Sequence, residues 1–445
     1  MSDSASRTYD FAVVGGGIAG LAIAELLQRS GASVILLEKN EVLCSGASSE
    51  QQGWFHTGAL YSALPDQFFC RTLAGNLDDL VDYYSDFPNM NLRIGTHIST
   101  KGPRGWFSNH TVFYAYAGLR SVGWKWKVPW ALALSRAKRR ISWYESLDSS
   151  RSLSQQVGKR TPPLQSILHR SPLPIPPDDV SFVLKSRDRS MDARLIGEDL
   201  LRSFLGSGGR LALGVQVESI TAGTVRGIQR ATGESLQLLA GHTIVATGKD
   251  AAAFDRHVRV FISPLLVAVP ALTEVNFARM SPEVKGTINH LYHDTGSIQY
   301  SVIGNAMSYA SSDWNDERRG EASRLMMERA RHVWKHIDAH RTKIYFGSKT
   351  EMEPSTGPRN YLYRILDHNG YTLALPGKFS LCFSLAVNVC RHFGVEPVQR
   401  IRMASGEMDS LVAVPQHLQL ARQLSGLSPA EVATVFSDVP ILYQT

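Results

Sequence analysis

The sequence predicts an α/β fold in which a doubly wound domain, assembled from discontinuous segments, is joined to an α+β domain built on an antiparallel sheet. Three observations predict it. Residues 9–38 read as strand, glycine turn, helix and strand. Short strands and helices of the same kind return after residue 191, and residues 256–345 contain apolar, β-prone stretches. The first two patterns are typical of a parallel sheet covered by helices, and the third is typical of antiparallel sheet.

The first element is a short apolar strand at residues 9–14, followed by three consecutive glycines. Residues 18–28 are rich in alanine and leucine and predict a helix, which Gly31 ends. Residues 33–38 form a second apolar run that predicts a buried strand. This order is the opening of a doubly wound sheet.

The glycines have the spacing Gly15-x-Gly17-x-x-Gly20 of a dinucleotide-binding turn. Gly15 allows the tight turn, Gly17 lets the backbone approach a pyrophosphate, and Gly20 lets the helix pack closely on the strand. Glu38 ends the second strand, where a carboxylate can accept hydrogen bonds from ribose hydroxyls. The predicted nucleotide contacts here also include Ile18, Ala19 and Lys39.

Further elements follow the same reasoning from hydrophobic periodicity. We expect helices at residues 76–84, 193–205, 317–339 and 376–393, and strands at residues 210–220, 242–248, 257–269, 297–303 and 370–374. We therefore assign residues 1–99, 181–255 and 346–445 to the doubly wound domain, and residues 100–180 and 256–345 to a substrate domain.

The composition limits the class of protein. The 445 residues are 43% hydrophobic and 20% charged, as in ordinary globular proteins, and the net charge is +7. The four cysteines have no C-x-x-C spacing and no grouping with histidine that suggests a metal site. They are expected to be reduced thiols, as in a cytoplasmic protein. Such a protein could be free in the cytoplasm or attached to a membrane surface. We find no apolar stretch long enough for a transmembrane helix and no signal peptide pattern.

Residues 44–61 favour FAD over NAD. Small and hydroxyl residues follow soon after Glu38, and then a histidine lies in a glycine-containing loop. This segment resembles the D-amino-acid-oxidase-like FAD superfamily, which includes glycine oxidase, L-2-hydroxyglutarate dehydrogenase and FAD-linked glycerol-3-phosphate dehydrogenase. The resemblance implies that a G-x-S-S segment surrounds the pyrophosphate of FAD, and that the H-x-G loop after it passes the flavin ring. Matching the first are Gly46, Ser48 and Ser49, and matching the second are His56 and Gly58.

Two further segments carry the same resemblance. Residues 244–248 are similar to the family's second FAD contact strand. Val217 lies where relatives pack backbone against the adenine. Residues 375–381 are similar to the loop whose N–H groups face the pyrimidine edge of the flavin, where they favour its reduced form. The FAD contacts implied by these segments are Val217, Ala246, Thr247, Gly248, Gly377, Lys378 and Phe379.

The resemblance implies an FAD-dependent oxidoreductase, either dehydrogenase or oxidase. We expect it to oxidise a C–H next to O or N in a small, anionic hydroxy acid or amino acid, by hydride transfer to flavin. His56 is the leading site residue, as a flavin contact, a proton acceptor, a covalent attachment point or only a structural hydrogen-bonding group. Gln51, Gln52, Trp54 and Phe55 are bulkier than the usual family loop. The substrate side is therefore expected to differ.

Other catalytic candidates come from outside the nucleotide-binding segments. Relatives often place an arginine before the last strand to hold a substrate carboxylate, which implicates Arg359 or Arg364. His290, His293 and Tyr300 fall in the expected substrate sheet. Histidines three positions apart on a strand point to opposite faces, so at most one of the two is expected in the pocket.

A tryptophan-rich stretch leaves several alternatives open. Trp124, Trp126 and Trp130 are interleaved with lysines, and a basic run follows at residues 136–140. Such a mixture suits an anionic membrane surface, although tryptophans of the substrate-domain core explain it equally well. Single-stranded nucleic acid is the least favoured partner.

The electron acceptor is expected to be oxygen, a quinone or a protein. The alternative function is a flavin-binding redox or structural partner without turnover.

Overall fold

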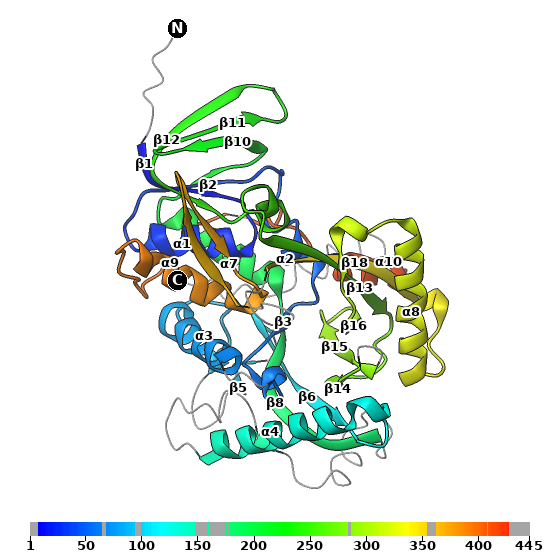
Figure 1. Cartoon of the computed structure of the whole chain (residues 1–445). Coiled ribbons are helices and arrows are strands. Elements are labelled where there is room, and N and C mark those ends of the chain that lie inside the picture. Colours follow the sequence, from blue (N-terminus) through cyan, green and yellow to red (C-terminus); the bar gives the residue numbers. More distant parts are fainter. Residues whose placement is uncertain are drawn as a thin grey trace.

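The computed structural model contains two large sheets (Figure 1). A cavity lies between them. The described residues are 8–64, 68–93, 99–102, 104–146, 159–160, 175, 179–283, 286–353, 362–406 and 408–426. Arg359 and most of residues 147–178 lie outside them. In the described residues no helix has the length and apolar character needed to cross a membrane.

The first sheet is the predicted doubly wound sheet. Its strands follow the order β10-β11-β12-β1-β2-β9, with β20 beside β12 and β19 beside β20. The pairs β12–β1, β1–β2, β2–β9 and β12–β20 are parallel, as expected for buried strands joined by helices. The bounds are β1 Thr8–Val14, β2 Val34–Leu37, β9 Arg210–Ala212, β10 Val215–Thr221, β11 Thr224–Gln229, β12 Ser235–Val245, β19 Arg364–His368 and β20 Tyr371–Leu375.

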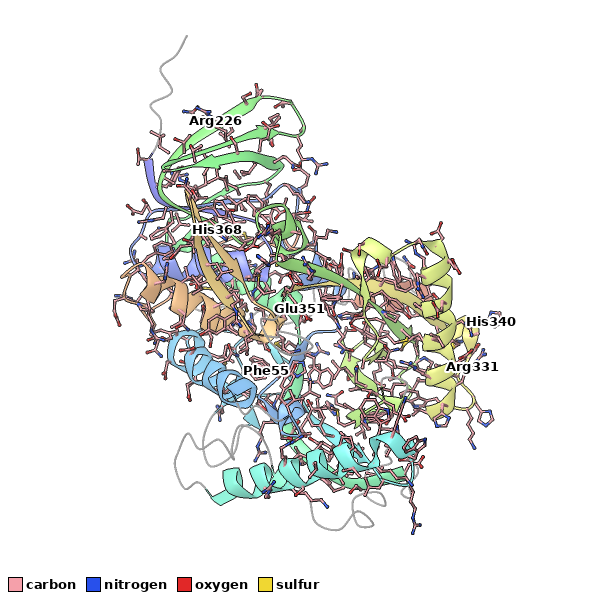
Figure 2. The ribbon with its side chains drawn as sticks, in the orientation of Figure 1. Phe55, Arg226, Arg331, His340, Glu351 and His368 are labelled. Atoms are coloured by element: carbon pink, nitrogen blue, oxygen red, sulfur yellow. The ribbon has the colours of Figure 1, made fainter. Side chains whose placement is uncertain are left out.

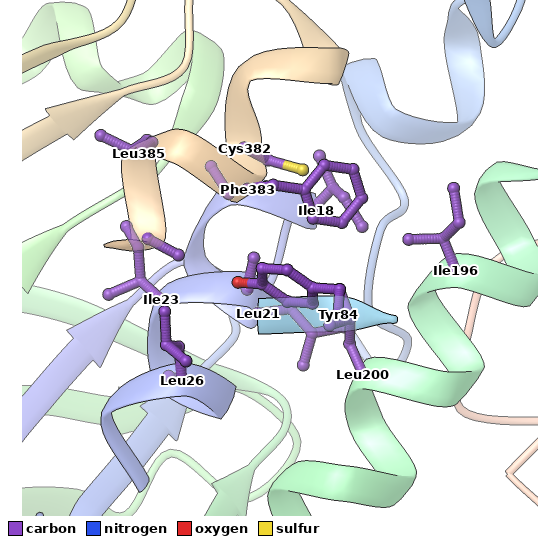
Figure 3. Close-up of a cluster of buried hydrophobic side chains, with 14 of the residues drawn as sticks. Ile18, Leu21, Ile23, Leu26, Tyr84, Ile196, Leu200, Cys382, Phe383 and Leu385 are labelled. Carbon is purple, nitrogen blue, oxygen red and sulfur yellow. The ribbon is translucent and has the colours of Figure 1, made fainter. Parts of the chain in front are cut away.

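Helix α1 (Ile18–Arg29) lies at the centre of the core beneath this sheet, between α7 (Ala193–Gly206) and α9 (Cys382–His392). Leu21 and Leu26 of α1 belong to one buried cluster with Leu200 of α7 and Leu385 of α9, and Figure 3 shows all four side chains. Both leucines of α1 are fully buried, and each such side chain contributes about 1.5–3 kcal/mol to the free energy of unfolding. The almost continuous apolar surface of α1 therefore fixes the helix whose first turn faces the cavity.

The second sheet is mainly antiparallel, as the sequence predicts for the substrate domain. Its order is β17-β13-β16-β15-β14-β6-β8-β3, with β18 beside β13 and β7 beside β8, and only β6 and β14 pair in parallel. The bounds are β3 Trp54–Phe55, β6 Phe107–Ala117, β7 Lys159–Arg160, β8 Val180–Met191, β13 Val258–Ala268, β14 Asn276–Met280, β15 Ile288–Asp294, β16 Gln299–Asn305, β17 Tyr309–Ala310 and β18 Thr342–Met352.

The remaining helices lie around these sheets. Helices α8 and α10 contact β13, and α4 lies at the lower edge of the molecule beside β7 (Figure 1). Helix α8 ends at Val333, six residues before the predicted end. The bounds are α2 Ala47–Glu50, η1 Ala59–Tyr61, α3 Phe68–Tyr84, η2 Trp124–Trp126, α4 Lys127–Ser146, α8 Asp316–Val333 and α10 Gln416–Ser425, and a separate ribbon joins β4 Leu92–Arg93 to β5 Ser99–Thr100.

The fold class is confirmed. Three strands, however, belong to a different sheet from the one implied by our domain assignment. Strands β3, β8 and most of β18 come from segments assigned to the doubly wound domain, yet all three belong to the second sheet. A strand's own pattern shows that it is buried, whereas its sheet depends on which neighbour it pairs with. This pairing matters for the site, because β3 and β8 bring distant residues together.

Candidate active site

One large cavity, of about 1430 Å³, runs between the two sheets. At one end it is bordered by the turn before α1 and the end of β2, and at the other by the loop after β3 and the segment before α9. Strands β13, β14, β16 and β18 line its other side. Glu351 of β18, which lies at the centre of the molecule in Figure 2, is part of this wall.

The glycine turn has the conformation and contacts that the sequence predicts. Gly15 has φ +107°, and a Cβ there would lie 2.6 Å from the Ala246 carbonyl oxygen. A Cβ on Gly20 would collide with the Gly15 carbonyl oxygen. A Cβ on Gly17, in contrast, would meet only Ser48 Oγ, at 3.6 Å, and would project into the cavity. Gly15 and Gly20 thus serve the packing of the turn, whereas Gly17 keeps the cavity open.

The acidic residue at the end of β2 organises this turn. Glu38 Oε2 accepts a hydrogen bond from the Gly16 N–H at 2.6 Å, and Oε1 accepts from the backbone and side chain of Asn40, each at 2.9 Å. Its neighbour Lys39 forms an ion pair of 2.5 Å with Asp250. All of these residues except Gly16 line the cavity.

The small-residue segment after Glu38 lies against the first turn of α1. Ser48 Oγ accepts a hydrogen bond from the Ile18 N–H at 3.0 Å, one of the helix N–H groups without an intrahelical partner. Gly46 and Ser48 line the cavity beside Ile18 and Ala19. Ser49 does not line it, and its hydroxyl donates instead to the Gly46 carbonyl oxygen at 3.1 Å.

The two other predicted FAD segments meet this wall from distant parts of the sequence. Val217 of β10 lines the cavity near Glu38. The end of β12 and the loop before α9 line it as well, with Ala246, Thr247 and Gly248 from the first and Gly377, Lys378 and Phe379 from the second. Every predicted FAD contact other than Gly20 and Ser49 is therefore part of one cavity wall.

His56 follows β3 directly and lines the cavity beside Trp54, whose ring centroid is 4.6 Å away. Gly58, with φ +108°, provides the left-handed turn that leads into η1. His56 Nδ1 lies 3.4 Å from Oδ2 of Asp188. Because a carboxylate accepts hydrogen bonds, this contact favours the tautomer with a proton on Nδ1 and none on Nε2.

Asp188 is held by more than His56. Its Oδ1 accepts from the Thr57 N–H at 2.8 Å and from the Thr57 hydroxyl at 2.6 Å, and its Oδ2 accepts from the Tyr114 hydroxyl. Asp188 is fully buried. Burial and the nearby Asp188 raise the pKa of Tyr114 well above its usual value, so the phenol remains a donor. These bonds fix the carboxylate and the loop that carries His56.

The charge state of His56 follows from its surroundings. Burial lowers the pKa of His56 to about 4, and the positive charges of Lys378 and Lys349 act in the same direction. Asp188 opposes this shift but does not reverse it. Near neutral pH the imidazole is therefore uncharged, with Nε2 available to accept a proton. Lys378 also lies over the Tyr61 ring, 5.3 Å from its centroid.

The other predicted catalytic residues do not line the cavity. Tyr300 is buried behind it, where its hydroxyl lies 3.0 Å from His417 Nδ1. His290 bridges the Val275 carbonyl oxygen, at 2.9 Å, and Ser301 Oγ, at 2.7 Å. Neither position gives access to a ligand in the cavity, because each polar group already has a partner in the core. His293 is half-buried and also lies outside the lining, so neither histidine of the pair reaches it.

Arg364 begins β19 and its guanidinium donates to the Tyr363 carbonyl oxygen at 3.1 Å, outside the cavity lining. Arg359 lies outside the described residues, so its role stays a prediction. The cations that do line the cavity around His56 are Lys349 and Lys378. Sequence reasoning missed Lys349, Asp188 and Tyr114, because nothing in their local sequence distinguishes them from other strand residues.

The residues present fit a dinucleotide cofactor of the FAD type. Gly17 leaves space that a Cβ would fill, at the N-terminus of a helix that favours phosphate. Within the described residues, Thr247 Oγ1, Trp54 Nε1 and Asn289 Oδ1 are buried polar atoms of the cavity wall without a hydrogen-bond partner. Such atoms are expected where a polar ligand completes a site. The cavity thus joins a phosphate cradle to a chamber that contains His56.

Comparisons with known proteins agree with this geometry. A family model described as FAD dependent oxidoreductase matches residues 10–376. Glycine oxidase from Geobacillus kaustophilus superposes with a TM-score of 0.61 at 14% identity, over 92% of this chain and 98% of that one. L-alpha-glycerophosphate oxidase from Mycoplasma pneumoniae gives 0.61 at 13% identity, over 91% and 98%. Glycerol-3-phosphate dehydrogenase from Bacillus halodurans gives 0.58 at 14%, over 96% and 75%.

No curated protein matches the chain by sequence. At these identities the structural likeness shows the fold alone, whereas the family model spans most of the chain. The match to the family model and the FAD-type cradle lead to the same conclusion. The chain belongs to the FAD-dependent oxidoreductase family, and FAD is its cofactor.

Proposed function

We propose that this enzyme oxidises the C–H bond next to the hydroxyl or amino group of a small carboxylic acid, a hydroxy acid or an amino acid. The observation that carries the proposal is the grouping of neutral His56 with two lysines. Lys349 and Lys378 line the same cavity, and both charges act on the His56 imidazole. A proton acceptor beside two fixed cations is what the oxidation of an anionic alcohol or amine requires.

Each group has a distinct role in this proposal. The ammonium groups of Lys349 and Lys378 attract the substrate carboxylate and orient the neighbouring carbon. His56 Nε2 accepts the proton of the hydroxyl or amine, and Asp188 on Nδ1 stabilises the positive charge that then develops. Bound FAD supplies the acceptor for the hydride that leaves the carbon. The products are a carbonyl compound or an imine and reduced cofactor, so the electrons balance.

Apolar side chains form part of the wall of this chamber. Leu60, Tyr61 and Leu64 line the cavity on the His56 side, and Met280 lines it from β14. Exclusion of water strengthens the attraction between the lysines and an anionic substrate, because fewer water dipoles screen the charges.

One of the relatives' names matches this substrate class, and another names an anionic phosphate instead of a carboxylic acid. They include oxidases of glycine and of α-glycerophosphate, which are an amino acid and an anionic polyol. The segment His-Thr-Gly-Ala-Leu-Tyr from His56 favours the hydroxy-acid and glycerol-phosphate enzymes over the amine oxidases. The electron acceptor stays a prediction with three candidates, oxygen, a quinone or a protein, and so does a cytoplasmic location.

The test is anaerobic reduction of the purified holoprotein by candidate substrates. The loss of the flavin's visible absorbance measures the reduction. Hydroxy acids, amino acids and polyol phosphates are compared with neutral amides of the same compounds. We expect an acid to reduce the protein and its amide to do so much more slowly. His56→Ala should slow this reduction, and an unchanged rate and spectrum would remove the role of His56.

The alternative function, a flavin-binding redox or structural partner without turnover, predicts a different result. Such a protein would be yellow and would keep its colour with every compound of the panel. Reduction by any of the acids at a rate that depends on His56 rejects this alternative.

A further inference from the structure

The exposed apolar side chains of this protein are concentrated on one helix. Among the described residues, the large hydrophobic side chains with more than half of their surface exposed are Trp124 at 85%, Val128 at 72% and Leu132 at 59%. They recur every fourth residue through η2 and α4, so they form a stripe along one helix face. Leu119, at 40%, lies just before this stripe in the sequence.

The opposite face of the same helix holds it in the fold. Trp130, Leu134 and Ala137 are buried in a cluster with Tyr116 and Phe182. Trp130 Nε1 donates to the Ala117 carbonyl oxygen at 2.8 Å. The exposed stripe is displaced from this row by two positions, about half a turn. Packing therefore accounts for one apolar face of α4 and leaves the other without a partner in the described chain.

This arrangement differs from the three-tryptophan surface that the sequence suggested. Trp130 belongs to the core, and Trp126 is partly buried against the same cluster. Only Trp124 of the three is exposed. Val128 and Leu132, which the sequence pattern did not single out, complete the surface instead.

The charged side chains of the segment that carries the stripe have one sign. Residues 119–144 contain seven lysines and arginines and no aspartate or glutamate. Of these cations, Arg120, Lys125, Lys127 and Arg139 are exposed. A carboxylate from another part of the chain, that of Glu283, accepts a hydrogen bond from the Gly123 N–H at 3.0 Å. An apolar stripe flanked by cations fits the boundary between the headgroups and acyl chains of an anionic bilayer.

We propose that the outer face of η2 and α4, made of Trp124, Val128 and Leu132 with the flanking cations, docks on an anionic lipid surface. Figure 1 shows α4 at the lower edge of the molecule, at the opposite end from the β10–β11 hairpin. In this arrangement the stripe enters the headgroup region, while Lys125 and Lys127 remain at the level of the phosphates.

Two other occupants fit these observations less well. A second copy of the chain would bring two acid-free basic segments together, and the like charges would repel. Single-stranded nucleic acid is bound by several aromatic rings on which bases stack. This face offers the Trp124 ring, whereas its other exposed apolar groups are aliphatic.

Docking would bring one wall of the active-site cavity close to the lipid. The cluster beneath α4 also contains Tyr61, and Leu60 and Leu64 pack against it. All three line the cavity. In addition, Arg136 Nε donates to the Ala63 carbonyl oxygen at 3.3 Å. The helix that carries the stripe is thus fixed directly to the loop after His56, although the docking itself does not depend on the proposed oxidation.

The test is flotation of the holoprotein with vesicles of phosphatidylcholine alone or mixed with phosphatidylglycerol. We expect binding to the mixed vesicles and much weaker binding to the neutral ones, with a decrease at high salt. The variant Trp124→Ser/Val128→Ser/Leu132→Ser should weaken binding at least about ten-fold. Lys125→Glu/Lys127→Glu should weaken it too. All these side chains are exposed, so flavin content and thermal unfolding should match the wild type.

A matched charge control lies on another face. Arg331 lies in α8 and Lys335 just after it. Both are exposed, and Figure 2 shows Arg331 on the right flank of the molecule, on a helix other than α4. Arg331→Glu/Lys335→Glu should bind the mixed vesicles as the wild type does. The proposal is wrong if the wild type does not float, if the triple serine variant floats equally well, or if both charge variants lose binding alike. Binding of an oligonucleotide or self-association through the same face, without flotation, would also overturn it.

Discussion

The carboxylate of Asp188 lies 3.4 Å from Nδ1 of His56, although 132 positions separate the two residues in the sequence. The contact exists because β3 and β8 pair, with Phe55 opposite Arg189. It leaves Nε2 of His56 without a proton, and Asp188 is the only carboxylate recorded within bonding distance of this imidazole in the described chain. We therefore regard Asp188 as the positioning residue of the proposed proton acceptor.

Replacement of this carboxylate tests the relationship. In Asp188→Asn the side-chain amide donates to Nδ1, so the favoured tautomer carries its proton on Nε2, the atom that should accept one. We expect the limiting rate of anaerobic flavin reduction to fall about 100-fold, with a much smaller change in the concentration for half-saturation. Stopped-flow absorbance measures both quantities.

A control is available in the same network. Tyr114→Phe removes one hydrogen bond to Asp188 and leaves the carboxylate in contact with His56, so its rate should fall far less. Equal rates for Asp188→Asn and the wild type would show that Asp188 has no positioning role, provided that both bind flavin.

The second prediction concerns the charge of Lys378. After burial, Lys378 is the largest cause that lowers the pKa of His56 to about 4. In Lys378→Met this pKa should rise towards its usual value of 6.5. Because a protonated imidazole cannot accept a proton, the reduction rate of the variant should begin to fall at a higher pH than the wild-type rate as the solution is acidified. Rates between about pH 5 and 8 provide the measurement.

Lys349→Met serves as the comparison, because Lys349 has the smallest recorded effect on the pKa of His56. It should move the pH profile less than Lys378→Met while weakening binding of an anionic substrate. A wild-type profile that falls with a midpoint near pH 6.5 would contradict the lowered pKa of His56.

The third prediction concerns the phosphate cradle. A Cβ on Gly17 meets only Ser48 Oγ, at 3.6 Å, so Gly17→Val should fold normally yet occupy the space beside the first turn of α1. We expect its affinity for FAD to decrease at least about ten-fold, which corresponds to about 1.4 kcal/mol. Flavin released by acid, relative to protein, gives the occupancy.

Gly320→Ala is the matched control for this variant, since Gly320 lies in α8 with no atom within 4 Å of a Cβ. It should retain the full flavin content. A Gly17→Val protein that is as yellow as the wild type would mean that the pyrophosphate does not bind at this turn.

The fourth prediction concerns stability in acid. Burial lowers the pKa of His56 and His293 to about 4, that of His290 to about 3 and that of His417 well below its usual value. The unfolded chain binds these protons near pH 6.5, whereas the native state does not. The free energy of unfolding should therefore decrease as the pH falls from 6.5 to 4, by up to about 1.4 kcal/mol per pH unit for each histidine.

Urea unfolding at pH 7 and pH 5 measures this slope. His293→Phe keeps an aromatic ring beside Tyr300, whose centroid is 5.1 Å away, and removes one of the four protons. Its slope should be smaller by about one histidine. His340→Gln, at the exposed position shown in Figure 2, should leave the slope unchanged. If His293→Phe retains the wild-type slope, this histidine does not contribute to acid instability.

Much of the nucleotide-binding part could be predicted because its constraints are local. The glycine spacing, the carboxylate at the end of the second strand and the following small residues each act on neighbours close in the sequence. The structure brings Gly17, Glu38 and Ser48 to one wall, as expected. The predicted strands at residues 242–248 and 370–374 correspond to β12 and β20, which pair directly with each other.

The substrate side could be predicted only in part. Tyr300 and His290 lie on the expected antiparallel strands, but their side chains are in the core rather than in the cavity. Periodicity shows which residues of a strand share a face, and it does not show which face meets the cavity. Lys349 lies on such a strand too and does line the cavity.

By itself, the sequence determined the doubly wound fold and the cradle around Gly17, because steric demands at a turn and hydrophobic periodicity act over short stretches of chain. It also offered His56 as a candidate through its family resemblance. Only the tertiary structure decided that Asp188 pairs with His56, that two lysines meet at the cavity, and that Trp130 is buried while Trp124 is exposed. Those outcomes depend on which strands and helices pack together, and this is set by the sum of many long-range contacts that no single segment encodes.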